Sequence, residues 1–320
     1  MSQLAGSAAT SIYRGRTPQL LNDAATNSLN VSALPMAAFQ YPLFVWHMMR
    51  EVERNAAEIG LPVIVKPAAS NGSIGVRLCR DFKELAEHTS HFFGGKHIWR
   101  SSPRILVEEL VEGPQYTVEM MGDQIVGIVA AEYGPLPQFV YRQFTMPAPL
   151  NDDQQKRIAD VSLKSLRALD LGWGPTNIEL RWTHRGPVVI EVNPRIAGAP
   201  DPQMVHAAYG IDLIREHIKL VIGERLDLRK SHSRTAAARI LVPDRDGILD
   251  WIGGQFRAAA VPGIADVKLY SKLPTPIIRK GDARDCIGHV IAVASCPAEA
   301  ETILQRAVDL IHWSITPFSP

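Results

Sequence analysis

The stretch at residues 187–198, which reads Pro-Val-Val-Ile-Glu-Val-Asn-Pro-Arg-Ile-Ala-Gly, constrains this chain more than any other. Its β-branched, apolar first half predicts a strand that ends at Pro194. Glu191 and Asn193 stand two residues apart in this strand. Because side chains alternate between the two faces of a strand, both project from the same face. The strand therefore presents an acid and an amide side by side.

A further acid, Glu179, lies twelve residues before Glu191 in the strand-like segment Thr-Asn-Ile-Glu-Leu-Arg-Trp. Residues 183–186, between the two strands, predict a hairpin turn. Antiparallel pairing would bring Glu179, Glu191 and Asn193 together, with Arg195 just past the strand end. Hard cations such as Mg²⁺ bind oxygen ligands of this kind and keep open positions for phosphate oxygens. The alternative is a hairpin whose polar face is simply solvated.

Composition and length bound the class of protein. The chain has 320 residues, enough for two domains, and 46% apolar residues, 21% charged residues and a mean hydropathy of −0.03 are typical of a soluble globular protein. A net charge of +1 argues against binding to nucleic acid or membrane through bulk electrostatics. No apolar run approaches the ~20 residues of a membrane span, and the first residues lack a signal-peptide pattern. Three scattered cysteines, Cys79, Cys286 and Cys296, suit neither a disulfide framework nor a zinc site, so we expect a cytoplasmic protein.

A short strand at residues 61–67 carries Lys66 near its end and leads into a loop of small residues at 68–76. This loop, Ala-Ala-Ser-Asn-Gly-Ser-Ile-Gly-Val, can lay its backbone N–H groups against phosphate oxygens because no bulky side chain blocks the approach. It matches neither a Walker A loop nor a Rossmann fingerprint. An ordinary glycine hairpin is the alternative. A lysine near the end of an apolar strand needs an anionic partner, however, and this favours a phosphate loop.

The other segments predict alternating helices and strands. Strands are expected at 104–111, 115–120, 125–131, 236–242 and 287–295, a loop followed by a strand at 261–270, and helices at 39–59, 81–91, 152–169, 202–222 and 297–312. Residues 1–35 have no clear period, and we expect them to be loose or locally ordered. Residues 134–150, with four prolines, predict a long irregular loop of the kind that covers a site. Beyond a basic link at 228–234 the pattern is self-contained, which predicts a small α+β appendage.

The order of these features resembles that of a known family. A strand with Lys-Pro, a Gly/Ser loop, a strand ending in Val-Glu-Glu-Leu, the run Glu-Gly-Pro-Gln-Tyr-Thr-Val-Glu, and the two acids with Asn-Pro-Arg follow one another. This order is similar to that of the ATP-grasp superfamily, in the carboxylate–amine ligase branch that contains L-amino-acid (dipeptide) ligases and D-alanine–D-alanine ligase. Residues 284–294, with Gly288-His289-Val290, resemble the appended domain of the L-amino-acid ligases.

The resemblance implies an α+β fold in which two α+β subdomains grip ATP, with a small C-terminal α+β appendage. It divides the chain into a shortened N-terminal segment at 1–57, an ATP-grasp domain at 58–228 and an appended ligase-type domain at 229–320. The ATP-grasp domain would consist of a first subdomain at 58–112 and a second at 113–228.

The resemblance also implies a role for each residue that matches a family motif. Lys66 would contact an ATP phosphate and the adenine edge, Arg195 would stabilise the transferring phosphoryl group, and these two are the expected catalytic residues. The lid over the β- and γ-phosphates would contain Ser70, Gly72, Ser73 and Gly75. The nucleoside would be held by Glu108, Glu109, Leu110 and Gln115. The two Mg²⁺ (or Mn²⁺) ions would be held by Glu179, Glu191 and Asn193.

The activity implied is ATP-dependent joining of a carboxylate to an amine. The γ-phosphoryl group of ATP would move onto the carboxylate, an amine would attack the acyl phosphate, and phosphate would leave as the amide bond forms. The expected partners are small-molecule carboxylate and amine substrates. Neither nucleic acid nor membrane is expected, and a homodimer is left open.

Departures from the family pattern keep alternatives open. The family usually has a whole α/β domain with a further lysine before the first ATP-grasp strand, whereas no lysine precedes Lys66 here. Gln115 stands where a ribose-binding Glu is usual, although an amide can still bond a ribose hydroxyl. One alternative is therefore a nucleotide-binding protein that is catalytically impaired or depends on a partner. A biotin-carboxylase type of reaction is a further one, disfavoured because no companion domain is present.

Substrate recognition departs from the dipeptide-ligase pattern as well. Tyr141 and Phe144 stand where dipeptide ligases tend to carry Glu and His, and Asn177 stands where a His or Arg is common. We expect Tyr141 and Arg142 to contact the substrate, with Arg142 engaging a carboxylate. The alternative is that Arg142 is a solvated loop residue.

Overall fold

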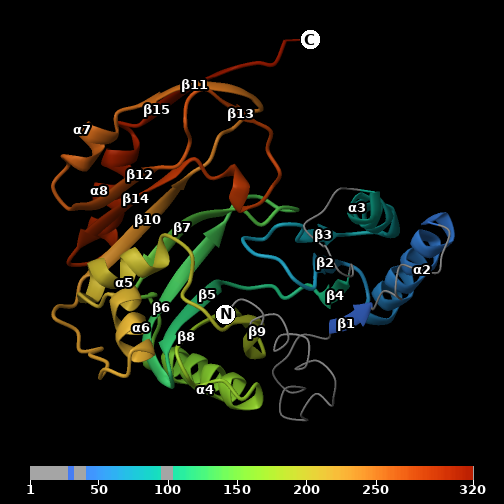
Figure 1. Ribbon diagram of the computed structural model, residues 1–320, viewed down its shortest axis with the longest axis horizontal. Coiled ribbons are helices and arrows are strands. Elements are labelled where there is room, and N and C mark those ends of the chain that lie inside the picture. Colours follow the sequence, from blue (N-terminus) through green and yellow to red (C-terminus); the bar gives the residue numbers. More distant parts are fainter. Residues whose placement is uncertain (1–27, 32–40, 95–103, 320) are drawn as a thin grey trace.

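A four-stranded antiparallel sheet forms the first structural unit, in the order β1-β4-β2-β3 (Figure 1). The computed structural model describes residues 28–31, 41–94 and 104–319. The strands of this unit are β1 (Ser28–Val31), β2 (Val63–Pro67), β3 (Arg77–Cys79) and β4 (Ile105–Glu109), and its helices are α2 (Tyr41–Ile59) and α3 (Phe82–Gly94). Residues of β2, β3, β4 and both helices share one apolar core. Because successive side chains of β2 and β4 point to opposite faces, Lys66 and Glu108 lie on the face away from this core.

An eight-stranded antiparallel sheet forms the body of the molecule, in the order β12-β14-β10-β7-β6-β5-β8-β9. Its strands are β5 (Gln115–Met121), β6 (Gln124–Tyr133), β7 (Tyr141–Met146), β8 (Pro175–Thr183), β9 (Gly186–Asn193), β10 (Thr235–Leu241), β12 (Ile264–Leu269) and β14 (Gly288–Ala294). Helix α4 (Asp152–Ala168) packs on one face, against the core that contains Val118 and Ile178. Helix α5 (Asp201–Tyr209) packs on the other face, against Val129 and Phe144. Thr117 is paired directly with Val129 on one side and with Glu179 on the other, so these three side chains project from the same face of the sheet. Val129 packs against α5, and the acids of the site therefore lie on the α5 face.

A small three-stranded sheet completes the C-terminal part, in the order β13-β11-β15. Its strands are β11 (Gly247–Gly253), β13 (Thr275–Ile277) and β15 (His312–Thr316), and it is accompanied by α7 (Gln255–Ala259), the short 3₁₀ helix η2 (Ala283–Asp285) and α8 (Pro297–Val308). Buried residues of α8 join residues of β11, β10 and β14 in one core. Helix α8 therefore packs on β10 and β14 of the large sheet and shares a core with β11 of the small one.

The prediction of an irregular loop at 134–150 is wrong in part, because residues 141–146 form strand β7 in the middle of the large sheet. Strand β7 pairs with β6 on one side and with β10 on the other. The four prolines of the segment lie on either side of residues 141–146 rather than among them, so every ladder N–H is present. Tyr141 and Phe144 are thus strand residues.

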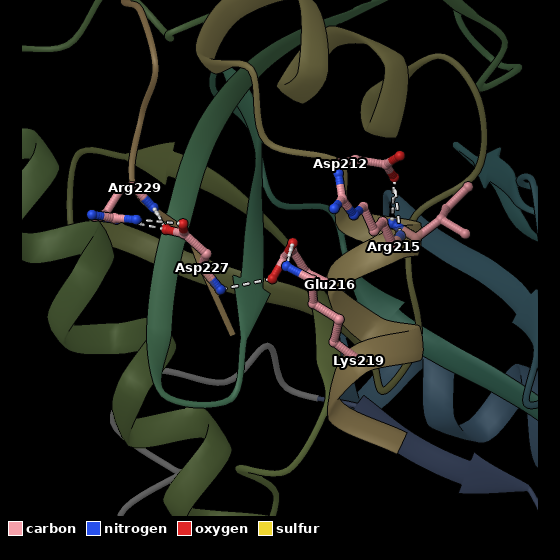
Figure 2. Close-up of polar contacts among 7 residues, drawn as sticks. Asp212, Arg215, Glu216, Lys219, Asp227 and Arg229 are labelled. Carbon is pink, nitrogen blue, oxygen red and sulfur yellow. Dashed lines mark hydrogen bonds and ion pairs between the residues drawn. The ribbon is translucent and has the colours of Figure 1, made fainter. Parts of the chain in front are cut away.

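The single helix predicted at 202–222 is also wrong, because α5 ends and a second helix, α6 (Leu213–Val221), begins after a break. Gly210 has a φ of 74°, the left-handed conformation that ends α5. Asp212 then caps α6 by accepting hydrogen bonds from the backbone N–H groups of residues 214 and 215, as Figure 2 shows. Buried Glu216 accepts from Lys219 Nζ and from the Asp227 N–H, each at 2.7 Å, and so fastens α6 to the chain that follows (Figure 2).

The segment after residue 228 is not self-contained, which corrects the expectation from its sequence pattern. Its strands β10, β12 and β14 extend the large sheet from β7 outward. The boundaries at 57, 112 and 228 stay predictions. Of the N-terminal stretch, residues 28–31 form β1 on the edge of the first sheet, and residues 1–27 and 32–40 lie outside the described ranges. Within the described ranges no helix is long and apolar enough to cross a membrane.

Candidate functional site

Strands β8 and β9 form the predicted antiparallel hairpin, with Thr183 paired to Gly186 at the turn. Glu179 stands directly opposite Glu191, and Asn177 directly opposite Asn193. Side chains of directly opposed residues lie roughly 5 Å apart at their Cβ atoms. The hairpin therefore brings the two acids and Asn193 to one place.

Glu179 is the most closely surrounded of these acids. Its Oε2 accepts a hydrogen bond from Tyr141 Oη at 3.0 Å and one from Gln115 Nε2 at 3.3 Å. Burial, and next the neighbouring Glu191 carboxylate, raise the pKa of Glu179 to about 7, while the bond from Tyr141 acts in the opposite direction. A carboxylate held in this way next to another acid is stabilised by a nearby cation.

The donor set fits a hard divalent cation. It offers the Glu179 and Glu191 carboxylates and the carboxamide of Asn193, whose Nδ2 is buried without a hydrogen-bond partner. In the part of the chain that the structure describes, no three His, Cys, Asp or Glu side chains are arranged to hold a metal ion. The amide would therefore have to be the third protein ligand, and phosphate oxygens and water would fill the other positions, as is usual for Mg²⁺.

Lys66 and Glu108 form an ion pair on the face of the first sheet. Their Nζ and Oε2 atoms are 2.7 Å apart, and the side chains are 13% and 9% exposed. Burial raises the pKa of Glu108, the charge of Lys66 lowers it, and the charge of Glu191 raises it further. Lys66 in turn lowers the pKa of Glu179. The Lys66–Glu108 pair on the first sheet therefore lies within electrostatic reach of the two acids on the second.

The loop between β2 and β3 contains the residues expected to cover phosphates. Ser70 Oγ donates to the carbonyl oxygen of Ile74 at 2.8 Å, and Gly72 and Ser73 have φ values of 57° and 59°. Within the described ranges the N–H groups of Ser73 and Gly75 donate no hydrogen bond. Two free amides in a tight loop form a concavity suited to anionic oxygens.

The segment that joins the two sheets holds the residues expected at the nucleoside. Glu109 pairs with Arg185 of the β8–β9 turn at 2.6 Å, and Leu110 packs beside Phe139. Gln115 is 5% exposed, and its Oε1 accepts from Arg181 Nε at 3.0 Å. The Gln115 amide is thereby oriented, with its Nε2 toward Glu179.

Arg181 is a site residue that sequence reasoning missed. Its Nη1 donates to the Val111 carbonyl at 3.0 Å, and its guanidinium lies over the rings of Tyr133 and Phe139. Arg181 follows Glu179 by two residues, which puts both side chains on one face of β8, and this spacing could have indicated it.

Glu119 and Asp201 are further acids that sequence reasoning did not assign. They are 2% and 5% exposed, and burial together with the neighbouring carboxylate raises the pKa of Glu119. Glu119 Oε1 accepts from Asn177 Nδ2 at 2.6 Å, and Asp201 Oδ1 is buried without a partner. Glu119 lies four residues after Gln115, on the same face of β5, and this spacing could have indicated it. Asn177 is thus engaged by a buried acid.

Arg195 and Arg142 are the two arginines that the sequence predicts at the site. Arg195 is exposed just beyond β9, its Nη1 donates to the Ile196 carbonyl at 3.1 Å, and its charge lowers the pKa of Glu119. Arg142 lies against Gly134, whereas its neighbour Tyr141 contacts Glu179. The structure therefore brings Tyr141, but not Arg142, to the acids.

Comparison with known proteins identifies the class to which this site belongs. Residues 59–202 match the family model of the ATP-grasp domain, and residues 239–316 match that of the L-amino acid ligase C-terminal domain 2. The resemblance to the carboxylate–amine ligase branch of the ATP-grasp proteins is therefore confirmed, and the structure has the expected α+β ATP-grasp fold.

Individual relatives show how much of the chain is similar to known proteins. The uncharacterized protein y4rH of Sinorhizobium fredii is 63% identical over 269 residues, which are 84% of this chain and 56% of that protein. Carnosine synthase 1 of Homo sapiens is 28% identical over 187 residues, which are 55% of this chain and 23% of that protein. The chain thus spans about half, or less, of the length of these relatives. A crystal structure of L-amino acid ligase from Bacillus licheniformis superposes with a TM-score of 0.68 at 19% identity, covering 84% of this chain and 71% of that one, which shows the fold.

Proposed function

We propose that this protein binds ATP with Mg²⁺ (or Mn²⁺) between its four-stranded and its eight-stranded sheet and joins a small-molecule carboxylate to an amine. The observation that carries the proposal is the approach of two groups of charges from different sheets: the Lys66–Glu108 pair on one side and Glu179, Glu191 and Asn193 on the other. Cation and acid clusters facing each other suit a polyphosphate with its metal ions.

In this proposal each part of the chain has one task. The free amides of Ser73 and Gly75 hold the terminal phosphates, and Lys66 neutralises phosphate charge while Glu108 positions its ammonium group. Glu179, Glu191 and Asn193 would hold the metal, which supplies charge neutralisation to the phosphates when bound. Exposed Arg195, beside these groups, is suited to stabilise the transferring phosphoryl group.

The bond changes follow from the poor electrophilicity of a carboxylate. A substrate carboxylate oxygen attacks the γ-phosphorus, the bond to the β-phosphate oxygen breaks, and ADP leaves. The amine nitrogen then attacks the acyl carbon, the C–O bond to phosphate breaks, and the amine gives up a proton. Phosphate and an amide are released, and the protein contributes mainly positioning and charge. We propose that Tyr141, which donates to Glu179, and the buried carboxyl pair of Glu119 and Asp201 lie next to these substrates.

A phosphate-release screen across carboxylate and amine pairs tests the proposal. We expect release of ADP and phosphate that requires both partners. If ATP binds but no pair stimulates release, the second candidate, a nucleotide-binding protein that is impaired or needs a partner, replaces the first. Release that requires bicarbonate instead would favour a biotin-carboxylase type of reaction, which the match to an L-amino acid ligase C-terminal domain disfavours.

We also propose a cytoplasmic location, because Cys79, Cys286 and Cys296 are all free thiols. A homodimer remains open, and size-exclusion chromatography with light scattering decides it.

A further inference from the structure

A backbone hydrogen bond joins residues 68–76, the expected phosphate loop, to the C-terminal segment. The N–H of Ala283, the first residue of η2, donates to the carbonyl oxygen of Gly72 at 2.9 Å. Gly72 belongs to the loop between β2 and β3, and Ala283 to the segment that matches the L-amino acid ligase C-terminal domain. Figure 1 shows η2 beside this loop, on the side away from α2 and α3.

The contact is tight as well as polar. A Cβ placed on Gly72 would lie 2.6 Å from the Cβ of Ala283, well inside contact distance, and Gly72 has a φ of 57°. Position 72 therefore accepts only glycine without adjustment while residue 283 carries a side chain.

The turn that carries Ala283 is firmly held. The buried carboxylate of Asp285 accepts from the N–H groups of Lys280 and Gly281, each at 2.7 Å. The buried carboxylate of Asp282 caps η2 by accepting from the Arg284 N–H at 3.0 Å and binds its guanidinium at 2.6 Å. Three backbone donors and one guanidinium are thus bound by two acids of the turn itself, so the Ala283 N–H has a fixed direction.

A second contact supports the same closure. Gly281 packs against the side chain of Gln138, and the carbonyl oxygen of Pro137 accepts from the N–H of Leu78, on β3, at 3.3 Å. The loop between β2 and β3 is therefore bound to η2 at Gly72, and strand β3, which follows it, is bound to the segment before β7.

We propose that Ala283 is a positioning residue, whose backbone N–H holds the phosphate loop closed over the nucleotide. The inference rests on the proposed function, since it assigns to the C-terminal segment the task of keeping ATP in that site. Ala283 acts only through Gly72 and touches no substrate. Loss of its N–H frees the loop and lets nucleotide leave faster, because a bound ligand is retained in proportion to the closed population.

The substitution Ala283→Pro removes this N–H and puts the proline Cδ where the hydrogen was, so the Gly72 carbonyl must also move away. Proline suits the first position of a helix, and Asp282 before it is extended, with φ −147° and ψ −171°. Ala283→Ser, which keeps the N–H, is the matched control. In the full chain without nucleotide, we expect hydrogen exchange of the amides at 70–76 to be faster in Ala283→Pro only. With Mg²⁺ and ATP, we expect dissociation to be about fivefold faster and association unchanged, the size of one net hydrogen bond.

A double-mutant cycle tests the packing without removing the donor. Gly72→Ala should raise the dissociation rate of ATP about tenfold, from backbone strain plus the collision with the Ala283 side chain. Adding Ala283→Gly removes the collision and should lower the dissociation rate of the Gly72→Ala variant at least threefold. Ala283→Gly alone should have little effect on this rate. If Gly72→Ala is equally defective with and without Ala283→Gly, the two residues do not act together and the proposal is overturned.

The two readouts separate this proposal from the proposed function. Wild-type protein that binds no ATP contradicts the proposed function, and the nucleotide-free exchange of residues 70–76 still decides whether Ala283 holds the loop. ATP binding with identical exchange and dissociation in wild type and Ala283→Pro overturns the role of Ala283 and leaves the proposed function standing.

Discussion

Replacing Lys66 by methionine should destabilise the first sheet in a manner that depends on pH. In the wild type its ammonium group lies 2.7 Å from Glu108 Oε2, and both side chains are largely shielded from water. Burial alone outweighs the effect of Lys66, so that the pKa of Glu108 is raised above its ordinary value of 4.5 even with this partner present. In Lys66→Met the same carboxylate is buried without a counter-charge, and its pKa rises further.

The magnitude follows from the degree of burial. Removing one partner of a fully buried ion pair costs about 3–5 kcal/mol. Here the side chains keep 13% and 9% exposure, and Glu108 can take up a proton. We therefore expect a loss of about 2–4 kcal/mol at pH 8. A carboxyl group whose pKa is higher in the folded state than in the unfolded state contributes stability at low pH and loses it as the pH rises through the folded-state pKa. The loss should accordingly shrink at pH 5.

Urea unfolding of the full chain at pH 5 and pH 8, followed by circular dichroism, measures this difference. The control is Lys66→Met combined with Glu108→Gln, which removes the titrating group and should recover most of the loss at pH 8. A loss in Lys66→Met that is equal at the two pH values would refute the reasoning, as would a double variant no more stable than the single one.

Other predictions concern the acids and the edge of the site. Glu191→Ala should abolish ATP-driven phosphate release at saturating Mg²⁺ without altering the circular dichroism spectrum, because this exposed side chain is a proposed metal ligand; turnover within roughly tenfold of wild type contradicts that assignment. Asp201→Asn should raise the free energy of unfolding by about 1 kcal/mol, and more at pH 8 than at pH 5. Burial raises the pKa of Asp201, so the wild type loses stability as this acid ionises. A loss of stability at pH 8, measured by urea unfolding, excludes this view. Arg142→Ala should raise the KM of acyl donors that bear a second carboxylate and spare other donors, and an equal effect on both kinds removes Arg142 from substrate recognition.

The acid hairpin could be predicted because everything that forms it is local. Alternation in residues 187–193, a turn at 183–186 and a period of two are sufficient to pair Glu179 with Glu191. Lys66 at the end of a strand, followed by a loop of small residues, is equally local. The order of such motifs along the chain identified the family before any contact was known, and the family models agree.

Contacts between distant segments could not be predicted in this way. No local pattern specifies that β7 lies between β6 and β10, yet that position carries Tyr141 to Glu179. Asp201 reaches Glu119 only because α5 packs on the face of β5 from which Gln115 and Glu119 project.

The sequence by itself therefore determined the pairing of the acids and the family resemblance, through residue types at fixed spacing on single elements. The tertiary structure alone decided which further groups surround the site: Arg181 on Gln115, Asp201 beside Glu119, and Ala283 on Gly72. The reason is physical. Spacing along a strand or turn is set by backbone geometry, which every residue obeys, whereas the register and packing of distant segments depend on the whole core, and the whole core is not encoded in any one stretch.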